Sequence, residues 1–395
     1  MAVLSRPLSS PHGLGREGKR VNIATLRCST VRTLCRAAQD NGWGQYYRMN
    51  DITHPKRKVP RALITGLSGF TGRHMAALLL EEGFEVWGTV ISASEFVPGT
   101  TAVPVDLLDL DAMRACVADA RPDVVVHLAG LAHVTGNPPS RSYLVNIMGS
   151  RNLLEALTTL DQRPRSVLFA STSNVYGNAE VEVIDETVPI RPGNDYAVSK
   201  MAMEHMARLW LDRLPVFFTR PFNYTGVGQG EDFLLPKLVG HHARHERRIS
   251  LGNLNVHRDF SDVRDVVNVY ARLLDVAPAG EAFNICSGVG HSLSDLLVML
   301  ERIAGYKIDV FVDPRFIRHN EIARLVGSHN KLRRVIGRVP VTPIHDTLEW
   351  MFRHGRAEFE KANEGVARAG GASGPGKTEK PANEAPQTAP NARSG

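Results

Sequence analysis

The chain has 395 residues, of which 43% are hydrophobic and 22% charged, an ordinary composition for a globular protein with one large core or two moderate ones. No apolar stretch approaches the ~20 residues that span a bilayer, so we predict no membrane segment. The four scattered cysteines favour a reducing setting, and we expect a cytoplasmic protein. The net charge of +6 arises in residues 1–60, which hold eleven basic and three acidic residues, whereas the remaining chain carries −2. Because the basic excess lies outside the expected folded body, we predict no nucleic-acid binding.

Both ends of the chain lack the periodicity of helices or strands. Residues 1–57 are rich in Arg, Ser and Gly, and they predict a disordered extension or a start codon assigned too far upstream, with Met49 as the true start. An organelle transit peptide is the alternative for this Arg-rich, acid-poor segment. Residues 366–395 are rich in Gly, Pro, Ala and Asn and predict a disordered tail.

Between these ends, short apolar runs alternate with helical patterns. The predicted strands are 62–65, 85–90, 102–105, 124–129, 166–170, 216–219 and 282–286, and the predicted helices are 74–82, 111–120, 142–159 and 196–212. This order predicts an α/β fold with a doubly wound parallel sheet of the Rossmann type. We expect a dinucleotide-binding domain over 58–225, to which 258–290 returns. The smaller, mixed α/β substrate-binding portion should comprise 226–257 and 291–355.

The first strand leads into Thr-Gly-Leu-Ser-Gly-Phe-Thr-Gly, residues 65–72. Gly66 allows a sharp turn, Gly69 exposes backbone N–H groups that can face a pyrophosphate, and Gly72 allows close packing of helix on strand. Three glycines are a weak signal by themselves, and a plain helix-opening loop is the alternative. The position at the start of an alternating array favours a dinucleotide site.

A second pattern is Tyr196-Ala-Val-Ser-Lys200, whose first and last residues share one face of a helix. A lysine ammonium beside a phenol should lower the phenol pKa and suit it to acid–base chemistry. Hydroxyls follow the preceding predicted strand at Ser171, Thr172 and Ser173, where one can hydrogen-bond a substrate oxygen on which charge develops. A solvated helix face and ordinary strand-end capping are the structural alternatives.

The cysteines and histidines form no metal-binding pattern. The four cysteines are scattered without a Cys-x-x-Cys pair, which disfavours a disulfide framework or a zinc site. His241 and His245 lie one helical turn apart beside His242, but no glutamate accompanies them as in zinc proteases. We therefore predict no metal and interpret this segment as a solvated, Arg-rich helix.

Taken together, the motifs over 61–353 resemble the extended short-chain dehydrogenase/reductases that modify nucleotide sugars. The matching motifs are TGLSGFTG (65–72), VDL (105–107), HLAG (127–130), Asn146, STSNVYG (171–177), YAVSK (196–200), RPFNYTGVGQ (220–229) and RDFSDVRDV (258–266). The resemblance implies that Thr172, Tyr196 and Lys200 are catalytic. It also implies a set of cofactor-binding residues besides Tyr196 and Lys200: Gly66, Ser68, Gly69, Phe70, Gly72, Arg73, Asp106, Leu107, Leu128, Ala129, Gly130 and Asn146.

Within that family the motifs most resemble the branch that reduces GDP-4-dehydro-6-deoxy-D-mannose to GDP-D-rhamnose, a neighbour of the GDP-mannose 4,6-dehydratases. The dehydratases carry a glutamate base two residues before the position of Tyr176. This chain has Asn174 there, and an amide cannot take a proton at neutral pH, so ketone reduction is favoured over elimination. A nucleotide-sugar 4-epimerase, a 4,6-dehydratase and a non-catalytic cofactor-binding regulator are the alternatives.

The resemblance also implies how a GDP-linked 4-keto-6-deoxy sugar would bind. The implied substrate-binding residues are Asn174, Asn223, Lys237, Arg258, Arg318 and Glu321. Arg258 should reach the phosphates, since the planar guanidinium binds phosphate through paired hydrogen bonds. Arg318 and Glu321 should reach the guanosine. A surface salt bridge is the alternative for these charged residues. A homodimer through the helices over 142–159 and 196–212 is a family expectation.

The identity of the cofactor rests on fewer residues. The second predicted strand ends without the acidic residue that NAD enzymes use for the ribose 2′-hydroxyl. Arg73 follows the glycine motif and could contact a 2′-phosphate, although a helix-surface arginine is the alternative. We therefore predict NADPH as the cofactor, with NADH also possible.

Overall fold

The computed structural model describes residues 59–131, 138–316 and 322–370. The predictions for residues 1–57 and for most of the C-terminal tail lie outside these described residues. The same holds for the predicted substrate ligands Arg318 and Glu321.

A parallel sheet of seven strands forms the larger part of the described chain, in the order β10-β6-β5-β4-β1-β2-β3. Its strands are β1 (Arg61–Thr65), β2 (Glu85–Val90), β3 (Thr101–Pro104), β4 (Val124–His127), β5 (Ser166–Ala170), β6 (Val216–Pro221) and β10 (Ala282–Ile285). The central strands are apolar over almost their whole length, as expected where both faces of a parallel sheet are covered. The order reverses beside β1, because β2 and β4 flank it on opposite sides.

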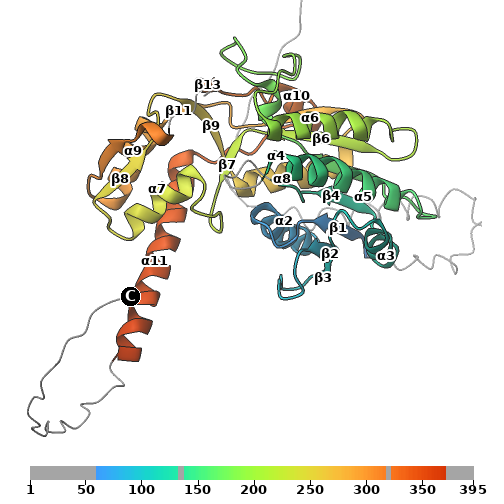
Figure 1. Cartoon of the computed structure of the whole chain (residues 1–395), viewed down its shortest axis with the longest axis horizontal. Helices are drawn as coiled ribbons and strands as arrows, with labels where there is room; N and C mark the ends of the chain where they lie inside the picture. Colours follow the sequence, from blue (N-terminus) through green and yellow to red (C-terminus); the bar gives the residue numbers. More distant parts are fainter. Residues whose placement is uncertain (1–58, 132–137, 317–321, 371–395) are drawn as a thin grey trace, which may run out of the picture. The chain divides into compact units, whose positions relative to one another are not determined.

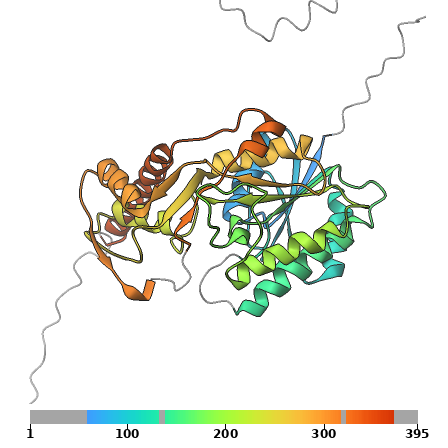
Figure 2. The same cartoon turned by 90° about the horizontal axis from the view of Figure 1, so that it is seen from above.

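Helices cover both faces of this sheet (Figure 1). One layer comprises α2 (Phe70–Glu81), α8 (Val263–Val276) and α10 (Asn330–Ile336), and the other comprises α3 (Leu110–Ala120), α4 (Pro139–Tyr143), α5 (Ser150–Leu157) and α6 (Asp195–Arg208). Figure 2 shows α5 and α6 in green on one side of the strands and α8 in gold on the other. Each layer buries its own apolar cluster against the sheet, one around Met75 and Leu79 and the other around Leu153 and Phe169.

A smaller α/β portion continues directly from β6. Its strands are β7 (Asn223–Thr225), β8 (Arg248–Leu251), β9 (His257–Asp262), β11 (Gly290–Ser292), β12 (Asp309–Val312) and β13 (Arg324–Leu325). Strand β9 pairs with β7, β11 and β13, whereas β8 pairs with β12 alone. The helices α7 (Leu234–Ala243), α9 (Leu293–Ala304) and α11 (Ile344–Gly370) share a third apolar cluster around Leu238, Leu297 and Leu348.

The predicted fold class is confirmed, and all seven predicted strands occur in the parallel sheet with ends within two residues of the expected positions. Three details differ. The predicted helix over 142–159 is interrupted by η2 (Leu144–Gly149), a π-helical turn that separates α4 from α5. Helix α11 runs to Gly370, so the predicted start of the disordered tail at residue 366 is too early. Within 258–290, α8 and β10 join the large sheet but β9 does not, and the predicted domain boundaries stay a prediction.

A buried ion pair fixes the position of α6 on the sheet. Two guanidinium nitrogens of Arg220, on β6, donate to the Glu204 carboxylate on α6 at 3.0 and 2.7 Å. The Arg220 and Glu204 side chains are only 6% and 1% exposed. Arg220 also donates to the Tyr176 hydroxyl at 2.9 Å, and this hydroxyl donates to Asn284 on β10 at 2.7 Å. The network therefore ties β6, α6 and β10 to the 3-10 turn η3 (Ser173–Tyr176).

We expect Glu204→Gln to destabilise the protein by about 3–5 kcal/mol, because it leaves the Arg220 charge buried without a counter-charge. The measurement is the shift in thermal and urea unfolding midpoints. The control is Glu358→Gln on α11, whose ion pair with His354 is exposed and should contribute within about 0.5 kcal/mol. Equal midpoints for the two variants would contradict the assignment.

Candidate active site

The predicted motifs meet at the carboxyl ends of β1 and β4, where the strand order reverses. In parallel α/β sheets this switch point is the usual position of a ligand site, because the loops on either side diverge. Thr65 at the end of β1 is in register with His127 at the end of β4. The glycine-rich turn follows Thr65, and the predicted cofactor residues Leu128, Ala129 and Gly130 follow His127.

The glycine-rich turn permits an unusually close approach of backbone segments. Gly66 has a φ of +74°, and a Cβ there would lie 3.0 Å from the backbone of Ala129. A Cβ at Gly72 would lie 2.2 Å from the Gly66 carbonyl oxygen, which is impossible without moving helix α2. Gly69 immediately precedes α2, so free backbone N–H groups of the first helical turn border the loop. This cradle fits a dinucleotide pyrophosphate.

A chain of buried hydrogen bonds holds β1, β4 and η2 together behind the cradle. The Thr65 hydroxyl and His127 Nδ1 are 2.7 Å apart, and His127 Nε2 lies 2.8 Å from the Ser150 hydroxyl. Since Ser150 donates to the Asn146 carbonyl at 2.7 Å, its oxygen accepts from Nε2–H, and Nδ1 accepts from Thr65. Burial, assisted by the charge of Lys200, lowers the His127 pKa to about 3. This histidine is therefore a neutral structural residue.

The three predicted catalytic residues come from two elements that pack together. Thr172 follows β5 and caps η3, while Tyr196 and Lys200 lie in the first two turns of α6. The Thr172 hydroxyl lies near enough to the Tyr196 phenol to oppose the rise in the phenol pKa. Lys200 is 5% exposed, and its ammonium donates to the Ala170 carbonyl at 2.9 Å. A hydroxyl pair and a buried cation thus lie beside the glycine cradle.

Asn146 and Gly130 connect these residues to the cradle. The Asn146 side chain accepts from the Leu131 N–H at 2.8 Å and donates to the Ser199 hydroxyl on α6 at 2.9 Å. A Cβ on Gly130 would lie 2.8 Å from Asn146 Oδ1 and 3.2 Å from Lys200 Nζ. The π-helical turn that carries Asn146 explains this position, since such turns commonly re-aim a side chain at functional sites.

Burial controls the protonation of the two titratable residues. It raises the pKa of Tyr196 to about 12, with Tyr224 adding to the shift and the Thr172 hydrogen bond opposing it. It also lowers the pKa of Lys200 to about 8, although the nearby Glu204 carboxylate opposes that shift. The sequence-based expectation of a lowered phenol pKa therefore differs from the structure, because burial of the phenol dominates the shift and raises the pKa. Tyr196 is a proton donor throughout the neutral range.

The remaining predicted cofactor residues lie on the loops around the cradle. Phe70 opens α2 and stacks on Tyr224 at 6.0 Å between ring centroids. Asp106 is exposed and accepts from the Leu108 N–H at 2.9 Å, whereas Leu107 is buried beneath it. The exposed Arg73 side chain donates to the Ser68 carbonyl at 2.8 Å, which turns its guanidinium toward the loop.

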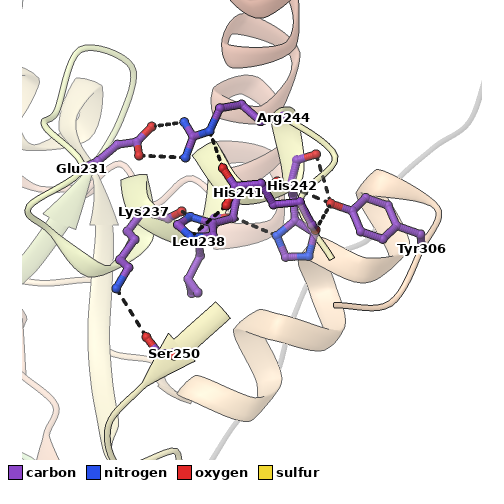
Figure 3. A network of polar contacts seen from close by, with 9 residues as sticks. Glu231, Lys237, Leu238, His241, His242, Arg244, Ser250 and Tyr306 are labelled. Carbon is purple, nitrogen blue, oxygen red and sulfur yellow. Dashed lines mark hydrogen bonds and ion pairs between the residues drawn. The ribbon is translucent and has the colours of Figure 1, made fainter. Parts of the chain in front are cut away.

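The described substrate candidates lie on the side of the smaller portion or beside Thr172. Asn174 belongs to η3, the turn that Thr172 caps. Asn223 opens β7 and pairs with Phe260 on β9, two residues beyond Arg258, so these two candidates lie on neighbouring strands. Lys237 lies on α7, where it donates to the Ser250 carbonyl at 3.3 Å (Figure 3). The structure brings Asn223 and Arg258 close in the fold and leaves Lys237 on a separate element.

The histidine-rich segment differs from the solvated helix that its composition predicts. His242 is fully buried, with Nδ1 2.8 Å from the Leu238 carbonyl oxygen. Figure 3 shows the Tyr306 hydroxyl reaching the end of α7, where it donates to the Glu246 carbonyl at 3.0 Å and lies near the His241 and His242 carbonyls. The histidines thus help to join α7 to α9. Within the described ranges, no group of three or more His, Cys, Asp or Glu side chains could hold a metal ion.

Sequence reasoning missed two residues beside the cradle. The hydroxyls of Tyr224 and Thr71 are 2.7 Å apart, and Tyr224 contributes to the raised pKa of Tyr196. Its place on β7, directly after Asn223, was the available signal. The carboxylate of Glu95, on the loop after β2, accepts a hydrogen bond from the Ser68 hydroxyl of the cradle. No local pattern marks that contact, because it depends on how the loop folds back.

The family model described as GDP-mannose 4,6 dehydratase matches residues 63–351. The chain is 33% identical to a GDP-6-deoxy-D-talose 4-dehydrogenase from Aggregatibacter actinomycetemcomitans, over 74% of this chain and 97% of the relative. It is also 33% identical to a GDP-6-deoxy-D-mannose reductase from Pseudomonas aeruginosa, over 73% of this chain and 94% of the relative.

Two solved structures are similar over the same region. A Burkholderia cenocepacia J2315 protein with a provisional epimerase name is 58% identical, with a TM-score of 0.72 over 75% of this chain and 98% of that one. The Pseudomonas aeruginosa protein RMD, complexed with NADPH, is 32% identical, with a TM-score of 0.65 over 76% of this chain and 98% of that one.

Among the described helices, none is long and apolar enough to cross a membrane.

The pKa of Lys200 makes a prediction about cofactor binding. We expect the affinity for a nicotinamide dinucleotide to fall as the pH rises through about 8, because the buried ammonium loses its proton there. The loss should reach up to about tenfold per pH unit above that value, whereas Tyr196 stays protonated and contributes nothing. Calorimetric titration between pH 6.5 and 9.5 measures this. Glu204→Gln should move the fall to lower pH, and a constant affinity would contradict the prediction.

Proposed function

Because the chain belongs to the GDP-mannose 4,6-dehydratase-like family of extended short-chain dehydrogenase/reductases, we propose that it reduces the C4 ketone of a GDP-linked 4-keto-6-deoxy-hexose. The observation that carries the proposal is that the Tyr196 phenol lies near the Thr172 hydroxyl, with Lys200 on the same helix as Tyr196 and beside the glycine cradle. An acid–base phenol and a buried cation at a dinucleotide site suit hydride transfer to or from a carbonyl.

In this proposal each residue has one role at the ketone oxygen or the cofactor. A bound NAD(P)H supplies the hydride to the C4 carbon, and negative charge develops on the ketone oxygen. Tyr196 donates its phenolic proton to that oxygen, which suits a phenol that stays protonated near neutral pH. Thr172 hydrogen-bonds the same oxygen, and Lys200 holds the cofactor ribose. Asn146 keeps α6 in place through Ser199.

Reduction is favoured over dehydration because of Asn174. Loss of water from the sugar requires a base to remove the proton beside the ketone, and a neutral amide does not supply one. One relative is named as a 4-dehydrogenase and another as a reductase, and neither name includes a dehydration. We propose GDP-D-rhamnose as the product. Product analysis must distinguish GDP-D-rhamnose from the sugar with the opposite configuration at C4.

We further propose how the substrate is held. Arg258 and Asn223 lie on the paired strands β9 and β7, and this position suits contact with the diphosphate and the adjoining sugar. Lys237 is proposed as a second cation for the nucleotide, and Arg318 with Glu321 as the guanosine contacts. The proposed cofactor is NADPH, as in the Pseudomonas aeruginosa complex, and NADH is also accepted.

A homodimer is proposed from an exposed apolar face on the helix layer behind the site. Leu144 and Met148 lie one turn apart and are 51% and 43% exposed, and Leu209 at the end of α6 is 74% exposed. Leu144 and Met148 lie on η2, which packs against α6, so the apolar residues lie on neighbouring elements. Apolar residues gathered on neighbouring helices are typical of an interface, and a second copy of the chain fits it.

The deciding assay follows NADPH and NADH oxidation with GDP-4-keto-6-deoxy-mannose and with the UDP- and dTDP-linked 4-keto-6-deoxy sugars. We expect stoichiometric cofactor consumption with the GDP-linked ketone and at least tenfold lower kcat/KM with the others, since polar nucleotide contacts discriminate strongly. Chromatography and NMR of the product give the C4 configuration. Interconversion of sugars without net cofactor oxidation would indicate an epimerase instead.

A matched variant separates chemistry from binding in the same assay. Tyr196→Phe keeps the ring and loses only the hydroxyl, so kcat should fall by about 10²–10⁴-fold while the affinity for the cofactor changes little. Undiminished turnover in this variant would remove Tyr196 from the mechanism.

A charged side chain introduced into the proposed dimer interface tests it. Met148→Glu should weaken self-association at least tenfold, because it desolvates a carboxylate in an apolar interface. Light scattering after size-exclusion chromatography measures the mass of the particle. Val276→Glu, at the end of α8 in the other helix layer and 51% exposed, is the control and should leave the mass unchanged. A monomeric parent protein would refute the proposed interface.

A further inference from the structure

The loop between β2 and β3 is anchored so that it returns to the glycine cradle. Val97 is 6% exposed and belongs to the same apolar cluster as Leu79 and Val90. Two residues earlier, the Glu95 carboxylate accepts from the Ser68 hydroxyl, and the Glu95 N–H donates to the Ser92 carbonyl at 3.0 Å. The anchored loop therefore places a carboxylate directly on the turn that precedes α2.

A cation borders the same point from the other side. Arg73, on the first turn of α2, donates to the Ser68 carbonyl at 2.8 Å. Arg73 also lines a hollow together with Ala77 and Leu80 of its own helix and with 96–98 of the loop. Glu95 and Arg73 thus converge on one residue, with opposite charges and different hydrogen-bonding capacity: a carboxylate only accepts, and a guanidinium only donates.

In doubly wound folds, charged residues near the glycine turn influence which dinucleotide binds. An acidic residue about twenty positions after the glycine turn accepts from the 2′-hydroxyl of an adenosine ribose, whereas a nearby arginine accommodates a 2′-phosphate. Strand β2 ends at Val90 without an acid, so a scan of the strand end finds none. Glu95 lies farther along the chain, but the fold returns it to Ser68. A carboxylate beside the ribose would repel a phosphate dianion and favour a free hydroxyl.

We propose that Glu95 is the residue of this chain that determines how it discriminates NADH from NADPH. Its carboxylate accepts from the 2′-hydroxyl of the adenosine ribose and disfavours a 2′-phosphate, while Arg73 attracts that phosphate. The two opposed charges leave the protein able to use both cofactors, and Glu95 lowers the preference for NADPH that Arg73 alone would give. The inference rests on the proposed function only in requiring a nicotinamide dinucleotide.

The test is equilibrium binding, which needs no sugar substrate. Calorimetry on the full chain gives the dissociation constants of NADPH, NADH, adenosine 2′,5′-bisphosphate and AMP for the parent protein, Glu95→Gln, Arg73→Gln and Glu358→Gln. Glu95→Gln removes the charge and keeps the shape, so NADPH affinity relative to NADH should rise about tenfold, and the two adenosine fragments should show the same change. Arg73→Gln should shift the ratio about tenfold the other way. Glu358 is exposed on α11, and its variant should match the parent.

An NADPH-to-NADH ratio that stays within about twofold of the parent in Glu95→Gln would overturn the proposal, provided that the variant unfolds at the parental temperature. A shifted ratio supports it even if no GDP-linked ketone is reduced, in which case only the proposed reaction fails. Failure of the parent protein to bind either dinucleotide would overturn both.

Discussion

Two glycines allow backbone segments to approach so closely that no side chain fits between them, and the rest of the site depends on that approach. A Cβ at Gly72 would meet the Gly66 carbonyl oxygen at 2.2 Å, and one at Gly66 would meet Ala129 at 3.0 Å. Helix α2, strand β1 and the residues after β4 can therefore converge, and the Thr65–His127 hydrogen bond fastens the two strands behind them. Without this convergence, α2 would start too far from β4 for one ligand to touch both.

Helix α6 carries two of the three proposed catalytic residues at a regular spacing. Tyr196, Lys200 and Glu204 follow one another at intervals of four residues, so they share one face of the helix. Arg220 neutralises Glu204, and Glu204 in turn opposes the loss of the Lys200 proton that burial favours. The buried pair therefore serves two purposes: it fixes α6 on β6, and it keeps the pKa of the lysine near 8 rather than lower. A change that exposes Lys200 to water would also expose the Tyr196 phenol, because the two side chains share one face of α6.

The parts of this structure that depend on local pattern could be predicted from the sequence. Apolar runs separated by helical patterns predicted the parallel sheet, and the spacing of Tyr196 and Lys200 predicted that they share a face. Contacts between distant segments could not be predicted in this way. Composition suggested that the segment around His242 is solvated, yet α9 and Tyr306 bury it. The break in the helix over 142–159 likewise depends on Asn146 reaching Leu131 and Ser199, which no local periodicity encodes.

The connection from β6 to β7 joins the smaller portion to the large sheet beside the candidate site. Strand β6 ends at Pro221 and β7 begins at Asn223, so a single residue separates the large sheet from the smaller portion. Strand β9 then pairs with β7, and the Asp259 carboxylate beside Arg258 accepts from the N–H groups of Ser287, Gly288 and Gly327 at 2.8–3.2 Å. These bonds fix the backbone that carries Arg258 relative to the sheet. Helices α7 and α9, by contrast, pack in their own apolar cluster. Changes in that cluster can alter the smaller portion while Thr172, Tyr196 and Lys200 keep their geometry.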